Sequence, residues 1–255
     1  MRKFLALWIV LAASLLCAGP VPIEFGSVPE KKLEVIKKIP YGTDNGQVGI
    51  FIPGKAEEKP FGPNAISGDG TGLFILDNMN RRVLSLDIRT KILKKELSLP
   101  SATFDALFVS KGTLFLHNSK EERLYARSGD TVRPETKIAA GKTTVYPYTK
   151  FMGNGTARVV VGEKEFFELA FTARSLMSFL LVGTADNGDL FFQIELADGS
   201  RHILITSGKG VVLGKMTLPT SDLYKPEKDI HVAGDGTVYV IAPGADALAV
   251  YGGRL

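Results

Sequence analysis

A strand–turn–strand phrase that returns along the chain constrains its fold more than any other feature. The best copy, residues 63–87, reads PNAISGDGTGLFILDNMNRRVLSLD, in which short apolar runs alternate with turns built from Asp, Asn and Gly. Runs of this length, bounded by turn residues, are typical of β-strands joined in hairpins. Weaker copies follow at intervals of 42, 43, 33 and 48 residues, measured between the turn glycines Gly70, Gly112, Gly155, Gly188 and Gly236.

The apolar pattern of these strands demands cover on both faces of each sheet. Leu73–Leu76 is apolar at every position, so a strand there places apolar side chains on both faces. A ring of sheets gives each face a neighbour, and four-stranded propeller blades repeat at roughly 40–50 residues. We therefore predict an all-β fold, a β-propeller of four-stranded blades, with five blades favoured and a sixth possible from residues 33–52.

The last repeat is one strand short, because only four residues follow Tyr251. Leu33–Ile39 reads either as a free strand or as one helical turn before Pro40. We predict that it is a strand that pairs with Ala247–Tyr251 and closes the ring. Such a closure removes a sheet edge that would otherwise invite aggregation.

Residues 1–19 have the layout of a secretory signal peptide. A short positive segment precedes the fifteen uncharged residues Phe4–Ala18, and glycine and proline follow. The apolar run is shorter than the ~20 residues of a membrane span. We expect export to a secreted or periplasmic location with no membrane span after cleavage, the alternative being an uncleaved anchor. Residues 20–32 are expected to be loose, and residues 33–255 to form a single propeller domain.

The only cysteine, Cys17, lies inside this leader and follows Leu16, whereas a lipid-modified cysteine needs a small residue before it. We expect the cysteine to be lost on cleavage, which leaves a mature chain without disulfides or thiolate sites. The formal net charge is +4, two charges of which belong to the leader, and no run of five like charges occurs. Charge therefore gives no support to a nucleic acid partner.

The first repeat resembles the NHL type of propeller repeat. In that type a proline opens the inner strand, an Asp-Gly turn and an aliphatic strand ending in Asp follow, and Asn and Arg-Val come next. The chain also looks like uncharacterised secreted bacterial propellers that open with Ile-Pro-Tyr-Gly. The resemblance implies a propeller fold and brings no activity with it. The matching positions are Pro63–Ile66, Gly68–Gly70, Leu73–Asp77, Asn80, Arg82–Val83, Asp229–Ile230, Gly234–Val240 and, for the opening segment, Ile39–Gly42.

Few residues offer chemistry in a recognisable pattern. The repeat places His117, His202 and His231 on the second, third and first strands of different blades, so we do not expect a three-histidine metal site. Asp186–Asp189 carries oxygen ligands but lacks the glutamate that completes a calcium loop, and we interpret it as a hairpin turn.

Two sets of polar residues have specific predicted roles. Asp105 and Asp229 each precede an inner strand, where they could act as acid–base groups or metal ligands, although capping of backbone N–H groups is favoured. Asp77, Asn80 and Arg82 are predicted to brace a hairpin through side-chain hydrogen bonds.

The loops around the central channel are the predicted ligand face. They comprise residues 41–60, 100–104, 143–148 and 219–228, and their aromatic side chains could stack on a sugar, grip a peptide or simply pack the loops. Our candidates for ligand binding are Tyr41, Phe51, Phe104, Asp105, Tyr146, Tyr148, Tyr224 and Asp229.

This set of residues favours a non-catalytic binding or scaffold module for a protein, peptide or glycan, with no catalytic residue, metal or cofactor assigned. The alternative is a metal-dependent lyase or hydrolase of the propeller class, with its site at the central channel. A third possibility is an accessory subunit of a larger assembly. The fold itself does not choose, because propellers host several functions.

Overall fold

The regular structure of the described residues is almost entirely β-strand. The computed structural model describes residues 21–54, 58–101, 104–110, 112–135, 147–151, 155–161, 164–172 and 176–255. These residues form 21 strands in five sheets, together with one 3-10 turn, η1 (Phe25–Ser27), and no α-helix. The predicted all-β class is confirmed. Within the described residues, no helix has the length and apolarity that crossing a membrane requires.

The first two sheets each follow one sequence repeat, with four antiparallel strands in chain order. All five predicted turn glycines, including Gly70 at φ +88°, adopt the positive φ that tight hairpins require. The strands are β4 (Ala65–Gly68), β5 (Gly72–Asp77), β6 (Arg82–Asp87) and β7 (Leu93–Ser98), then β8 (Ala106–Ser110), β9 (Thr113–Asn118), β10 (Arg123–Ser128) and β11 (Thr131–Pro134).

The other three sheets start in the same way, and the N-terminal part of the chain completes each of them. The third contains β12 (Pro147–Phe151), β13 (Thr156–Val161) and β14 (Lys164–Thr172). The fourth contains β15 (Leu176–Thr184), β16 (Leu190–Leu196), β17 (Arg201–Thr206) and β18 (Val212–Thr217), and the fifth β19 (Ile230–Val232), β20 (Val238–Pro243) and β21 (Ala247–Gly253).

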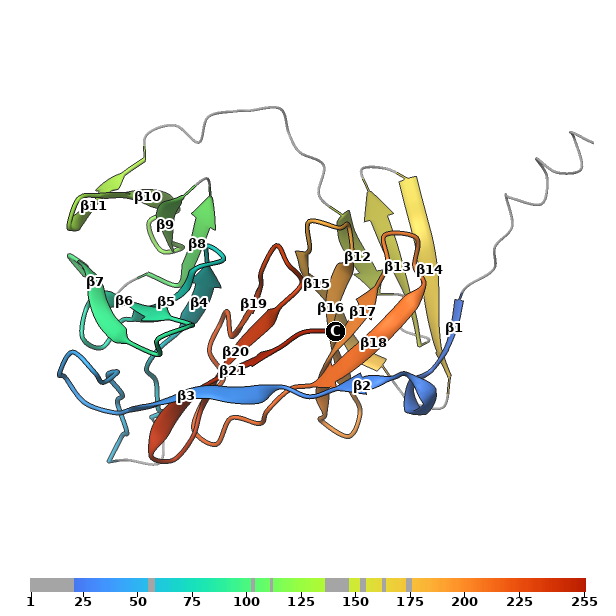
Figure 1. Cartoon of the computed structure of the whole chain (residues 1–255), viewed down its shortest axis with the longest axis horizontal. Helices are drawn as coiled ribbons and strands as arrows, with labels where there is room; N and C mark the ends of the chain where they lie inside the picture. Colours follow the sequence, from blue (N-terminus) through green and yellow to red (C-terminus); the bar gives the residue numbers. More distant parts are fainter. Residues whose placement is uncertain are drawn as a thin grey trace, which may run out of the picture.

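The segment Val21–Pro40, which we call the N-terminal strap, runs across these three sheets (Figure 1). Its strand β1 (Val21–Glu24) lies parallel to β14, β2 (Glu30–Lys31) lies parallel to β18, and β3 (Glu34–Pro40) lies antiparallel to β21. The predicted pairing of the free N-terminal strand with the last strand is confirmed. The finding not foreseen is that the strap also joins the third and fourth sheets.

Residues 20–32 were expected to be loose, and their described part is instead packed into the core. Ile23, Phe25 and Val28 are buried. The Lys215 ammonium donates a 2.7 Å hydrogen bond to the Phe25 carbonyl and lies 4.4 Å from the centre of its ring. The ring of His202 meets Phe25 edge-on at 4.8 Å. The prolines and charges of this segment suggested a loose chain. The three apolar residues between them are enough to anchor it in the core.

The five sheets form a propeller-like arc in which neighbouring sheets face each other (Figure 1). Their inner strands contact in the order β8, β4, β19, β15 and β12. Each of the four gaps between neighbouring sheets is filled by its own cluster of buried apolar side chains. The hydrophobic core is therefore divided into layers, and each layer is shared by two sheets.

The first sheet confirms that its strands need cover on both faces. Leu73 and Ile75 of β5 belong to the cluster shared with the fifth sheet, whereas Leu76 belongs to the cluster shared with the second. All three side chains are fully buried. Because successive side chains of a strand point to opposite faces, one continuous apolar run serves two cores.

The region 33–52 differs in part from the sequence-based expectation. Glu34–Pro40 is a strand rather than a helical turn, with Leu33 just before it. Residues 48–52 form only isolated bridges, one from Val48 to Tyr41 and one from Phe51 to Phe61. The described residues of this region therefore add one strand to the fifth sheet and no separate sheet.

Truncation of Phe25 tests the strap. We expect Phe25→Ala to lower the free energy of unfolding by about 3–5 kcal/mol, because it empties a buried site and removes the ring beneath Lys215. Urea denaturation followed by circular dichroism measures the loss. Ser27→Ala, two residues away and exposed, is the matched control. A Phe25→Ala protein as stable as the control would show that the strap is not anchored.

Candidate functional site

The candidate site depends on a polar cluster at the hairpin between β5 and β6, made of Asp77, Asn80 and Arg82, which we call the hairpin clasp. The Asp77 carboxylate is fully buried and forms a 2.9 Å ion pair with Arg82 Nε. It also accepts hydrogen bonds from the side-chain and backbone nitrogens of Asn80, at 2.9 and 3.3 Å. The prediction that these three residues brace the hairpin is confirmed.

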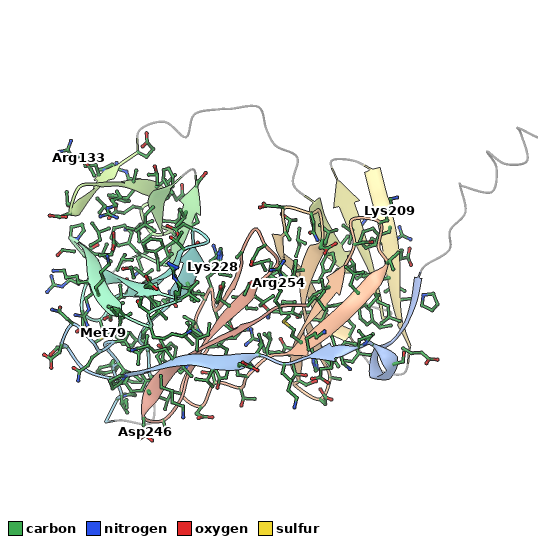
Figure 2. All side chains as sticks on the ribbon, in the orientation of Figure 1. Met79, Arg133, Lys209, Lys228, Asp246 and Arg254 are labelled. Atoms are coloured by element: carbon green, nitrogen blue, oxygen red, sulfur yellow. The ribbon has the colours of Figure 1, made fainter. Side chains whose placement is uncertain are left out.

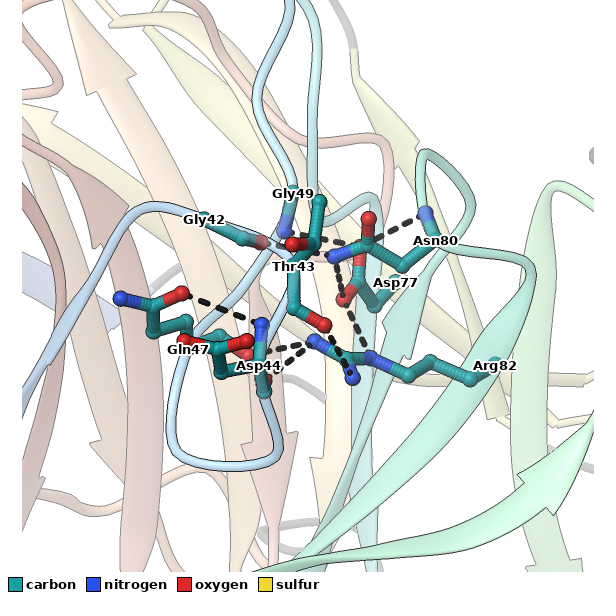
Figure 3. Close-up of polar contacts among 8 residues, drawn as sticks. All are labelled: Gly42, Thr43, Asp44, Gln47, Gly49, Asp77, Asn80 and Arg82. Atoms are coloured by element: carbon teal, nitrogen blue, oxygen red, sulfur yellow. Dashed lines mark hydrogen bonds and ion pairs between the residues drawn. The ribbon is translucent and has the colours of Figure 1, made fainter.

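The clasp also holds a distant loop, which sequence reasoning missed (Figure 3). Gly49 N donates to Asp77 Oδ1 at 3.0 Å, and Asn80 Nδ2 donates to the Gly42 carbonyl at 2.9 Å. The Arg82 guanidinium donates to three further carbonyls at 2.8–3.1 Å, those of Thr43, Asp44 and Gln47. A buried charge pair that is held by several further hydrogen bonds favours one geometry of its surroundings. Here it fixes residues 42–49 against the first sheet.

Gly49 is the point of closest approach between this loop and the clasp. A Cβ atom at Gly49 would lie 2.4 Å from Met79 Cβ and 2.9 Å from an oxygen of the Asp77 carboxylate. No side chain fits in that space, so the backbone N–H can reach the carboxylate only because residue 49 is glycine.

Beyond Gly49 the fixed loop presents two aromatic rings. Phe51 and Phe61 exchange backbone hydrogen bonds of 2.8 and 3.1 Å. Their rings lie 5.0 Å apart at an angle of 36°, and Phe61 remains 50% exposed. A large apolar ring held by its own backbone and still open to solvent is a feature typical of binding surfaces.

Phe61 borders a cavity of about 550 Å³, which we call the loop-side pocket. Its volume lies within the range of ligand pockets, about 300–1,000 Å³. Its wall is formed by Lys59–Gly62, Asn64, Asn78, Leu223–Lys225 and Glu227. Two of the four predicted ligand loops, 41–60 and 219–228, thus contribute to one cavity.

Two of the predicted tyrosines lie at or near this pocket, and a hydrogen bond fixes each phenol. Tyr224 donates a 3.1 Å hydrogen bond to the Pro63 carbonyl, and burial raises the pKa of its phenol well above the usual range. Tyr41 donates to the Gly244 carbonyl at 2.9 Å, and burial together with the charges of Asp222 and Asp246 raises its pKa to about 12. Both phenols are therefore protonated donors at neutral pH. Tyr224 is part of the wall, whereas Tyr41 does not line the cavity.

Neither Phe51 nor Phe104 lines this pocket. Phe104 is buried, packs edge-on against Tyr125 at 5.2 Å and uses its carbonyl to hold the amide of Asn78. Tyr148 lies in β12 opposite Val160, and Tyr146 falls outside the described residues. Phe104 therefore acts through packing and its backbone, since its ring cannot reach a ligand.

The two predicted aspartates are each engaged within the protein. Asp105 lies 3.0 Å from His117 Nδ1 and accepts the backbone N–H of Ser119 at 2.7 Å. Burial raises the pKa of Asp105, but the hydrogen bonds from Ser119 and His117 outweigh burial and lower it. Asp229 is buried and forms a 2.7 Å ion pair with Arg201 of the fourth sheet. They lie in different pairs and do not form a shared acid–base site.

A second cavity, of about 600 Å³, lies at the other end of β4, among the hairpin turns that carry the repeat glycines. We call it the turn-side pocket, and sequence reasoning did not single it out. Asp69, Asp186 and His231 are among its lining residues. Burial and the charge of Lys228, which Figure 2 shows near the middle of the arc, lower the pKa of His231 from 6.5 to about 4, against the opposing effect of Asp69.

The histidines occupy the strands that the repeat predicts, β9, β17 and β19, in three different sheets. Across the described chain, no group of three or more His, Cys, Asp or Glu residues is arranged to hold a metal ion.

Comparison with known proteins gives likenesses of shape only. No protein-family model and no curated protein matches the chain. Among solved structures, glutaminyl cyclase from Myxococcus xanthus is 12% identical over 89% of this chain and 99% of its own, with a TM-score of 0.39. The gluconolactonase XC5397 from Xanthomonas campestris is 9% identical over 87% and 98%, with a TM-score of 0.35.

A third likeness is to hydrazine synthase from Kuenenia stuttgartiensis, 16% identical over 76% of this chain with a TM-score of 0.30. This chain spans only 60% of that protein. At such identities and TM-scores, none of these likenesses indicates an activity for this chain, and the NHL resemblance stays a prediction.

Loss of the carboxylate charge tests the hairpin clasp. We expect Asp77→Asn to lower the free energy of unfolding by about 3–5 kcal/mol, because it leaves the Arg82 guanidinium buried without a counter-charge. Arg254→Gln, which removes an ion pair exposed at both partners, should stay within about 0.5 kcal/mol in the same urea titration. Equal losses in the two variants would contradict the assignment.

The lowered pKa of His231 makes a prediction for pH. The unfolded chain binds a proton on this histidine below about 6.5, whereas the folded chain does so only near pH 4, so stability falls as the pH drops between these values. We expect His231→Gln to flatten this part of the stability profile. Titration of the His231 ring signals by NMR checks the cause directly, and a midpoint near 6.5 would refute it.

Proposed function

We propose that this chain is an exported β-propeller of five blades that binds a protein, peptide or glycan in the loop-side pocket. Five sheets in the order of a propeller support the blade count, and the pairing of β3 with β21 supports closure by the N-terminal strand. The charged, then apolar, leader in residues 1–19 supports export to a secreted or periplasmic location.

The observation that carries the binding role is the half-exposed Phe61 ring, held in place at the border of the loop-side pocket. Its backbone is tied to Phe51, and residues 42–49 of its loop are tied to the hairpin clasp. Binding surfaces gain affinity when their anchors are rigid before the ligand arrives, because less freedom is lost on binding. A loop fixed by a buried ion pair, with an open aromatic ring, meets this requirement.

A second candidate, an enzyme with its site at the central channel, is favoured by one observation. The turn-side pocket holds a neutral imidazole, His231, close to the carboxylate of Asp69. A neutral imidazole can accept a proton, as a general base does, although the lowered pKa makes His231 a weak base at neutral pH. For the metal-dependent form of this candidate, the described residues contain no group of three or more His, Cys, Asp or Glu arranged to hold a metal ion. Stoichiometric zinc or calcium in the purified protein would favour the enzyme.

Replacement of Phe61 tests the binding role. The mature protein is screened by thermal shift against panels of peptides and oligosaccharides, and the affinity of each hit is measured by calorimetry. We expect Phe61→Ala to weaken binding roughly five- to ten-fold or more, as for the loss of a central anchor.

The matched control is Ile92→Ala, because Ile92 is 60% exposed and lies on the β6–β7 turn away from the pocket. Hits that bind Phe61→Ala and wild type equally would place the binding surface elsewhere. A panel without a single hit would count against a binding module for these ligand classes.

A further inference from the structure

The loop-side pocket carries an uneven set of charges. Lys59 and Lys225 lie at its wall with a single carboxylate, that of Glu227, and all three side chains are exposed. No ion pair between these residues, or from them to another described residue, is formed. Neither lysine forms an ion pair with a described carboxylate. The two positive charges therefore favour a ligand that carries an anionic group.

Two amide side chains form the polar part of the same wall. Asn64 accepts a hydrogen bond from Glu227 N at 3.1 Å and donates to the Asp105 carbonyl at 3.4 Å, which fixes its orientation. Asn78 donates to the Phe104 carbonyl at 2.6 Å, and its Oδ1 atom, although buried, receives no hydrogen bond. A buried acceptor without a donor is unfavourable. A hydroxyl group of a ligand would relieve this at the cost of a small movement of the amide.

Phe61 and Asn64 of this wall have backbone groups that are already hydrogen-bonded within the protein. Phe51 and Phe61 already use the N–H and carbonyl groups that face each other, and Asn64 uses both of its backbone groups with Leu76 and Lys228. A peptide that adds a strand needs unpaired backbone groups along a sheet edge. These three positions offer side chains to a ligand instead.

We propose that the ligand of the loop-side pocket is an acidic saccharide, a short chain of pyranose units that bears a carboxylate on the ring; this inference rests on the proposed binding function and names its ligand class. The C–H face of a sugar ring stacks on Phe61, the carboxylate lies between Lys59 and Lys225, and hydroxyl groups meet Asn78 and Glu227. The aromatic ring gives contact area, and the lysines give the preference for acid over neutral sugars.

Calorimetry with defined probes tests the proposal. The mature protein is titrated with trisaccharides of galacturonate and of glucuronate, and with the neutral trisaccharides of galactose and glucose. We expect at least one acidic trisaccharide to bind more tightly than its neutral partner, and the difference to shrink as salt is raised. Failure of both acidic probes to bind would overturn the proposal, as would equal binding of acidic and neutral probes.

Charge-removing variants locate the effect. We expect Lys59→Gln and Lys225→Gln each to weaken binding of the acidic probe roughly two- to five-fold, the range for an exposed ion pair, while binding of the neutral probe is unchanged. Lys209→Gln removes the same charge on the opposite side of the molecule from Met79, the neighbour of Asn78 (Figure 2), and should change neither. An equal effect of all three variants would show an unspecific attraction and overturn the assignment.

The binding function and the saccharide ligand class can be refuted separately. If peptides bind in a manner that depends on Phe61 and no saccharide does, the saccharide inference is wrong and the binding function stands. If Phe61→Ala changes the binding of no ligand of either class, both are wrong.

Discussion

The rest of this structure depends on one constraint. Each sheet that lies between two others in the arc needs apolar side chains packed against both of its faces. A single four-stranded sheet with leucines and isoleucines on both sides cannot be stable alone, because each face would be exposed to water. When sheets lie side by side, each layer of the core is formed by side chains from two sheets. The arrangement then leaves the strand ends, which carry the hairpin turns and the connecting loops, free to form pockets at the two ends of the inner strands.

Two further devices act together with this layered core. The N-terminal strap adds a strand to three successive sheets, so that one continuous segment links them. The hairpin clasp uses a buried ion pair to hold residues 42–49 on the first sheet, and so the loop that leads to Phe61. Stability and the geometry of the loop-side pocket thereby have a common origin.

The sequence predicted the features that local chemistry dictates. Positive-φ glycines follow from the Asp-Gly and Asn-Gly turns, and the bracing of a hairpin by Asp77 and Arg82 follows from their spacing across it. Pairing of the last strand with Leu33–Ile39 followed from counting strands. Local sequence does not show which distant residues a segment will pack against. Nothing in the sequence around Phe25 indicates that it packs beside Lys215.

The candidate site shows the same limit. Two of the four predicted loops contribute to the pocket, but burial decides which aromatic rings can meet a ligand. Phe104 is buried in the core, whereas Phe61, which was not predicted, stays half exposed. Hydrogen exchange followed by mass spectrometry shows whether the strap and the sheets that it joins open together, as interlocked layers must. We expect the strap strands β1 and β2 to exchange as slowly as the outer strands β14 and β18 that they cover. Exchange of the strap at the rate of an exposed loop, with β14 and β18 unaffected, would contradict this expectation.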